Sequence, residues 1–330
     1  MNMVSTLTNE RERPMYLGFV GLTWGVGTIL GPIIGGAFTD SSATWRRSFY
    51  INLCIGGLAA PFYLFLLPTA QPIGSHDRSI ISRIKDLDSA GTIISTGAIS
   101  SLVMAVSFPG GVYDWSSGQI IGLFVVTGVL WLAFVLQQRL SILTTPKNRL
   151  FPTMLLGSWE MEILFAQMAL AQVIVTVPIY FIPLYFQFAK DISAFQSGVQ
   201  LLPFILVLVF AVMLNGTLMA KVGYYMPWYL VGSMLALVGS VLLYTLDLDT
   251  SRAQIYGYSI LAAFGVGLFS QAGFPVAQVK AAPEHLSQVV AFIGIGQVGG
   301  ITLALTTALP TGSTTVRTFQ SLPVTCSGRK

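Results

Sequence analysis

Nine long stretches of this chain contain no Asp, Glu, Lys or Arg. A helix that crosses a bilayer needs roughly 20 mostly apolar residues, whereas a transmembrane barrel strand needs about 10 with alternating polarity. These stretches have helix length and no alternation, so the sequence predicts an all-α polytopic membrane protein. They are residues 15–38, 49–67, 90–108, 118–136, 163–188, 198–220, 226–246, 255–279 and 289–309.

The composition argues against a soluble protein, and it also argues against nucleic-acid binding, a disulfide and a metal or catalytic site. Only 9% of the residues are charged, against about 25% in soluble domains. The net charge of +4 comes from scattered basic residues rather than a patch, which excludes nucleic-acid binding. Cys54 lies in an apolar stretch and Cys326 lies in the polar tail, so a disulfide between them is not expected. His76 and His285 have no acid or thiol partner at the spacing of metal ligands. No cofactor, metal or catalytic residue is predicted.

The basic residues predict the orientation of the chain. Loops on the side of the N-terminus contain ten Lys and Arg residues, against four in the opposite loops, or seven when the C-terminal tail is counted. Because cytoplasmic loops carry the excess of basic residues, the N-terminus is predicted to be cytoplasmic. Four acidic residues lie at span ends and are interpreted as interfacial: Asp40, Asp88, Glu160 and Glu162.

The spacing of the apolar stretches predicts five regions. Residues 1–14 form a cytoplasmic segment, and residues 15–68 contain two spans. Residues 69–160 combine cytoplasmic loops with a two-helix hairpin, and residues 161–309 contain five spans. Residues 310–330 are Ser/Thr-rich without an apolar period, so a polar tail is predicted there.

The first apolar stretch contains a long pattern of small residues. Glycines four apart lie on one helix face and allow another backbone to approach, while proline removes one helical hydrogen bond. A single such pair is typical of ordinary helix packing, but the complete pattern is more specific. Its residues are Gly18, Gly27, Gly31, Pro32, Gly35 and Gly36.

This pattern resembles the antiporter signature in the fifth helix of major facilitator superfamily drug:proton exporters. A second segment resembles the start of the sixth helix in the fourteen-helix group, which is common in filamentous fungi. It departs from that group at Arg47, where Trp is usual, and at Cys54, where Pro is usual. The matching residues of this segment are Trp45, Arg46, Phe49, Tyr50, Asn52 and Gly56.

The resemblance implies a partial major facilitator fold truncated at both ends, with helices five to thirteen of fourteen. Residues 15–68 would then be the end of the N-terminal bundle, residues 69–160 would include the inserted hairpin, and residues 161–309 would form a partial C-terminal bundle. The family's main gating motif and its fourth-helix arginine would precede this chain.

The resemblance also implies a function. It implies a multidrug-resistance-type secondary active transporter that exports amphipathic drugs, toxins or secondary metabolites by proton antiport. The expected partners are the lipid bilayer, a small-molecule substrate and protons, and a monomer is expected. The plasma membrane is the expected location, with vacuolar or vesicle membranes as alternatives. The protein is not expected to be an enzyme.

Two other readings stay open at the level of sequence. The chain could be a non-transporting remnant, because alternating access needs two complete halves around one site. An integral-membrane enzyme is disfavoured, because it would need catalytic His or paired Asp residues near the membrane surface.

Uncharged polar residues within the apolar stretches are candidates for lining a substrate cavity. Amides and phenols can contact a substrate, although inside a membrane they more often bond neighbouring helices. We select six residues: Gln167, Gln172, Tyr180, Tyr185, Asn215 and Gln271.

Overall fold

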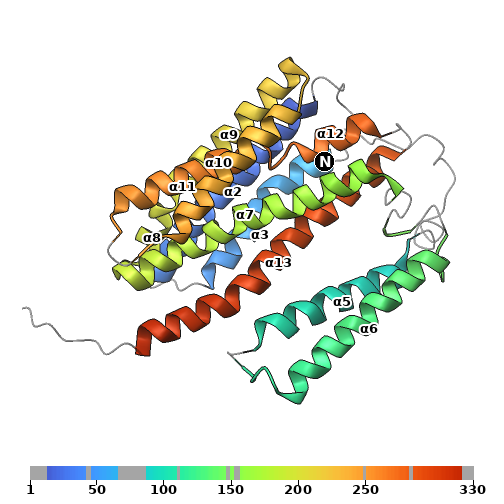
Figure 1. The fold of residues 1–330 in the computed structure, drawn as a ribbon, viewed down its shortest axis with the longest axis horizontal. Coiled ribbons are helices and arrows are strands. Elements are labelled where there is room, and N and C mark those ends of the chain that lie inside the picture. The colour runs from blue at the N-terminus through green and yellow to red at the C-terminus, as the bar shows by residue number, and fades with distance from the viewer. Residues whose placement is uncertain are drawn as a thin grey trace, which may run out of the picture. The chain divides into compact units, whose positions relative to one another are not determined.

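The computed structural model describes residues 13–41, 46–65, 87–109, 112–145, 149–151, 157–247, 250–281 and 285–321. Within these residues every regular element is a helix, apart from one isolated bridge between Pro109 and Tyr113. The helices, coloured along the chain in Figure 1, are α2 (Arg13–Asp40), α3 (Arg47–Phe65), α5 (Ser89–Ser107), α6 (Gly118–Leu140), α7 (Trp159–Lys190), α8 (Ala194–Gln200), α9 (Leu202–Val222), α10 (Met226–Tyr244), α11 (Arg252–Gly267), α12 (Gly273–Lys280) and α13 (Leu286–Ser321).

Eight helical segments in the described part of the chain are long and apolar enough to cross a membrane. Eight of the nine predicted stretches correspond to these segments, with α8 and α9 together forming one of them. The helix α3 has no buried residue, as expected for a surface that faces lipid rather than water. The chain is an integral, multi-pass membrane protein with an all-α fold.

The remaining predicted stretch, residues 255–279, is not one continuous helix, which corrects the sequence prediction. It divides into α11 and α12 around a turn at residues 268–272. Pro275 has no N–H to donate to the carbonyl of Gln271, so the regular helical bond is missing there. Tighter bonds occur in the turn instead, such as Ala272 N–H to Phe269 O at 3.1 Å.

The last helix is longer than the sequence predicts. The final apolar stretch ends at residue 309, but α13 continues through Ser321, so residues 310–321 are helical rather than an irregular tail. Ser and Thr lower helix propensity by less than about 1 kcal/mol each, and adding a residue to an existing helix is far easier than nucleating one. Residues 322–330 lie outside the described part.

The chain divides into two compact units, and α7 passes from one to the other at Pro178. Unit 1 contains residues 1–85 and 178–279. Within it α10 packs along α11, α9 contacts both α11 and α2, and α2 also contacts α8 and α3 (Figure 1). Glycines make these contacts close. A Cβ on Gly239 would lie 2.6 Å from Ala262 Cα, and one on Gly265 would lie 2.7 Å from Leu235 C.

Unit 2 contains residues 86–177 and 280–330. The helices α5 and α6 form the predicted hairpin, joined at mid-length by a buried hydrogen bond from Thr127 Oγ1 to Ser101 Oγ at 2.9 Å. The helix α13 contacts α5. It also meets the first part of α7, where a Cβ on Gly296 would lie 2.9 Å from the carbonyl oxygen of Phe165.

A substitution in α11 tests the α10–α11 contact. Gly265→Ala places a methyl group against the backbone of α10, and overpacking of this kind costs about 1–3 kcal/mol. We expect a lower thermal unfolding midpoint for the detergent-solubilised protein, measured by fluorescence-detected size-exclusion chromatography. Gly257→Ala on the same helix is the matched control, because a Cβ at Gly257 meets nothing within 4 Å among the described residues. An equal loss in both variants would contradict the prediction.

Candidate functional site

One face of α2 is in close contact with α9 and α8. A Cβ on Gly21 would lie 3.0 Å from Val212 Cγ1, and one on Gly25 would lie 3.3 Å from Val209 Cβ. A Cβ on Gly36 would lie 2.8 Å from the backbone nitrogen of Phe195. These separations leave no room for a larger side chain at the three glycines. Pro32 also belongs to this face, because a Cβ on Gly198 of α8 would lie 3.1 Å from its carbonyl carbon. We name this face the contact row: Gly21, Gly25, Pro32 and Gly36.

The contact row overlaps only partly with the predicted antiporter motif. Pro32 and Gly36 belong to both. A Cβ on the other four motif glycines, Gly18, Gly27, Gly31 and Gly35, would meet nothing within 4 Å among the described residues. Sequence reasoning missed Gly21 and Gly25, although their spacing of four was a signal for them.

The second predicted segment begins α3. Arg46 precedes the helix, and its carbonyl accepts the amide of Phe49 at 3.3 Å. The side chains of Phe49, Tyr50 and Asn52 are exposed, and so is Gly56. Trp45 lies outside the described residues. The structure therefore assigns this segment to the start of a helix.

The six polar candidates fall into different units. Gln167 and Gln172 belong to unit 2, and the other four belong to unit 1. Gln172 is buried with no partner for Oε1, and Asn215 is buried with no partner for Nδ2, among the described residues. The Tyr185 hydroxyl donates to the carbonyl of Asp247 at 2.7 Å, so it joins α7 to the segment after α10. Tyr180 is exposed beside Phe181.

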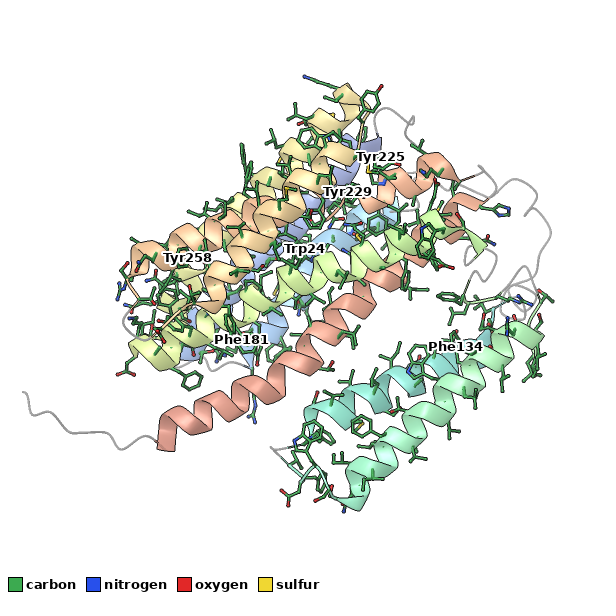
Figure 2. All side chains as sticks on the ribbon, viewed as in Figure 1. Trp24, Phe134, Phe181, Tyr225, Tyr229 and Tyr258 are labelled. Carbon is green, nitrogen blue, oxygen red and sulfur yellow. The ribbon has the colours of Figure 1, made fainter. Side chains whose placement is uncertain are left out.

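The break between α11 and α12 brings polar groups into the interior of unit 1. Gln271 lies in the break, and its Cγ is 4.0 Å from a Cβ built on Gly21. Figure 2 shows Tyr229 near one end of α10, and its ring centroid lies 6.2 Å from that of Phe269 in the break. The Tyr229 hydroxyl and both amide atoms of Gln278 are buried without a partner in the described part of the chain. Such groups are unusual in native interiors and suit a ligand or water.

A buried carboxylate at the start of the α5–α6 hairpin was not expected. Asp88 is only 5% exposed, although its place at a span end had indicated an interfacial residue. It caps α5 by accepting from Gly91 N–H at 2.8 Å and also accepts from Leu150 N–H at 3.1 Å. The amides of Gln137 and Gln138 donate to it at 2.9 and 2.6 Å. We call these five residues the Asp88 cluster.

Hydrogen bonding determines the charge of this carboxylate. Burial raises the pKa of Asp88, but bonds from Gly91, Gln138, Leu150 and Gln137 together outweigh it and lower the pKa below its usual value. Asp88 is therefore ionised at neutral pH, and the four donors take the place of a cation. An Asp directly before a helix is a typical capping signal, but its remote glutamine partners are not visible in the sequence.

The Asp88 cluster also connects the hairpin to the rest of unit 2. The amide of Phe151 donates to Gln138 Oε1 at 3.1 Å. The Phe151 ring meets that of Phe292 on α13 edge to face, with centroids 5.5 Å apart, and Phe292 in turn lies 4.8 Å from Phe165 on α7. Three helices of unit 2 are thus linked through one short segment.

A second polar contact of unit 2 joins two residues at helix ends. Lys280 and Glu160 form an ion pair with an Nζ–Oε2 distance of 2.5 Å. Glu160 lies in the first turn of α7, where the helix dipole also favours a negative charge. Among the described residues no group of His, Cys, Asp and Glu could hold a metal ion.

These features define a helical, multi-pass membrane protein in which a glycine-lined helix packs on two others and polar groups surround a helix break. The chain belongs to the Major Facilitator Superfamily, whose sequence profile matches residues 1–305.

Several fungal relatives are similar over most of this chain. It is 51% identical over 308 residues to an MFS-type transporter, pgmG, of Aspergillus terreus, covering 93% of this chain and 55% of the relative. It is 48% identical to an efflux pump, alnA, of Emericella nidulans, covering 92% and 55%. An efflux pump of Aspergillus clavatus, patC, is 44% identical, covering 90% and 54%. The chain spans about half the length of the curated relatives it matches.

A substitution at Asp88 tests the role of its charge. Asp88→Asn turns an amide donor toward groups that are themselves donors, and hydrogen bonds to a charged group contribute about 1.5–3 kcal/mol each. We expect a lower thermal unfolding midpoint near neutral pH in detergent. Because the folded-state pKa is lowered, the advantage of the wild type is present above the unfolded-state pKa and disappears as pH falls through the folded-state pKa.

The control for this measurement is Asp114→Asn, since Asp114 is exposed in the α5–α6 connection. It should leave the midpoint unchanged at all pH values. A difference between wild type and Asp88→Asn that persists at low pH would show that charge is not the cause.

Proposed function

We propose that this chain belongs to a secondary active efflux transporter that exports amphipathic small molecules, such as drugs, toxins or secondary metabolites, by proton antiport. The relatives named as efflux pumps support export, and the resemblance of the α2 pattern to the antiporter signature supports proton exchange. We further propose a monomer in the plasma membrane, with vacuolar or vesicle membranes as alternatives.

The structural observation that supports export by alternating access is the contact row. A helix that bears the antiporter pattern meets α9 and α8 through glycine and proline rather than through interlocking large side chains. In alternating access, packed bundles move against each other around a central site. A smooth glycine surface can allow such movement, because few side chains need to repack.

The proton-coupling step has no candidate among the described acidic residues. The acidic residues of the candidate spans lie at helix ends, and Asp88 and Glu160 already have partners. The proposal of proton antiport therefore rests on the resemblance of the α2 pattern to the antiporter signature. A protonophore that dissipates the pH gradient should stop export if the proposal is right.

We propose that the helix break of α11 and α12 contributes to a substrate cavity. Broken helices in the membrane occur where the backbone lines a cavity or is buried in protein. Gln271 within the break, beside Gly21 of α2, is the candidate we favour. Asn215, Gln167, Gln172, Tyr180 and Tyr185 remain predictions, with the Tyr185 hydroxyl already engaged.

A chimera tests the proposed function in a complete transporter. Residues 1–305 replace the matching segment of the Aspergillus terreus relative, and the product is expressed in a yeast that lacks its own efflux pumps. We expect cells to export ethidium or Nile red, measured by the loss of intracellular fluorescence, and a protonophore to stop this export. A chimera that reaches the membrane but moves no dye accepted by the parent relative would contradict the proposal.

Within this chimera, Gly25→Leu tests the contact row. A leucine at Gly25 collides with Val209 of α9, so α2 and α9 cannot approach, and we expect export to fall by about tenfold or more, the equivalent of at least about 1.4 kcal/mol. Val26→Leu, at the adjacent exposed position, is the control and should export normally. Equal export by both variants, at equal membrane levels, would exclude a role for the contact row.

A further inference from the structure

The end of α2 nearest Asp40 makes backbone contact with the first turn of α8. A Cβ on Gly36 would lie 2.8 Å from Phe195 Cα and 2.9 Å from Ala194 C. From the other side, a Cβ on Gly198 would lie 3.1 Å from the carbonyl carbon of Pro32. Both helices therefore present glycine at the contact, and their backbones touch.

A carboxylate completes this contact. Asp40 Oδ2 accepts a hydrogen bond from the backbone N–H of Phe195 at 3.2 Å. The first amides of a helix have no partner within the helix. In α8, Ser193 accepts from Gln196 and Ser197, whereas the Phe195 amide uses an acceptor from a different helix.

The helix α8 is also attached on its other side. Gln187 of α7 donates through Nε2 to Ser197 Oγ at 2.8 Å. Further along α7, Lys190 donates to the carbonyl of Thr250 at 3.3 Å. Loss of the Asp40 bond would therefore remove the hydrogen bond between α2 and α8, while the bonds from α7 to α8 and to the α10–α11 connection stay in place.

We propose that Asp40 is a positioning residue that holds the outer end of α2 against α8. It keeps this end of the contact closed, and the bond must break and both groups become hydrated whenever α2 separates from α8. The inference rests on the proposed function, because alternating access requires this separation, and on the predicted orientation, which places this end outside.

The test measures accessibility rather than export, so its failure differs from failure of the proposed function. The 330-residue chain carries Cys54→Ser and Cys326→Ser, and Ala194→Cys serves as the reporter at the contact. Intact cells are treated with a membrane-impermeant maleimide, and the rate of labelling is followed. We expect Asp40→Ala to raise this rate by about tenfold, as for the loss of one charge-assisted bond. Asp40→Asn retains an acceptor oxygen and should raise it less.

Two controls separate the proposed role from general loosening. Thr39→Ala changes the neighbouring residue, whose hydroxyl bonds within α2 to the carbonyl of Gly35 at 2.8 Å, and it should not change labelling. A second reporter, Gln196→Cys, lies on an exposed position of α8 and should react equally in all variants. The proposal is overturned if Asp40→Ala labels no faster than Thr39→Ala. It is also overturned if Ala194→Cys reacts only after permeabilisation.

Discussion

The close approach of helix backbones at glycine is the interaction on which unit 1 depends. Lipid offers helices no hydrophobic reason to associate, so their association relies on van der Waals contact and a few hydrogen bonds. Glycine provides the closest contact on α2 against α9 and α8, and on α10 against α11. These glycines therefore tolerate few substitutions. Where a Cβ would lie within 3 Å of backbone atoms, even alanine is too large.

Polar groups then determine which close-packed helices stay joined at their ends. Asp40, Tyr185 and Lys190 each bond a backbone group of another segment, and Asp88 collects four donors. The contacts of Asp40 and Lys190 lie at helix ends, where water is near and a charged group costs little to place, whereas Asp88 is buried and depends on its four donors. The interior of unit 1 differs, because Asn215 and Gln278 are buried with amide atoms that have no partner among the described residues.

Glycine contacts and end contacts have different consequences for a transporter. A glycine surface resists separation only weakly per residue, and it can slide without repacking of large side chains. A hydrogen bond between a carboxylate and a helix amide is directional and is lost over a small displacement. A moving bundle therefore needs both: a smooth surface along the helix and a small number of bonds that define its closed position. The contact row and Asp40 supply these two elements on α2.

The sequence by itself determined the membrane class, the approximate spans and the hairpin, because a charge-free run of about 20 residues has few alternatives to a transmembrane helix. It also located the glycine and proline pattern on α2, but it placed Asp88 at the membrane interface rather than in a buried helix cap. It did not show that Gly21 and Gly25, rather than Gly27 and Gly31, meet α9. The orientation of α2 about its own axis, which decides this, is set by the helices that pack against it. The break after Gly267 and the meeting of Asp88 with Gln137 and Gln138 likewise came only from tertiary structure. Residues far apart in the chain have no pattern that pairs them, and only packing decides which of them touch.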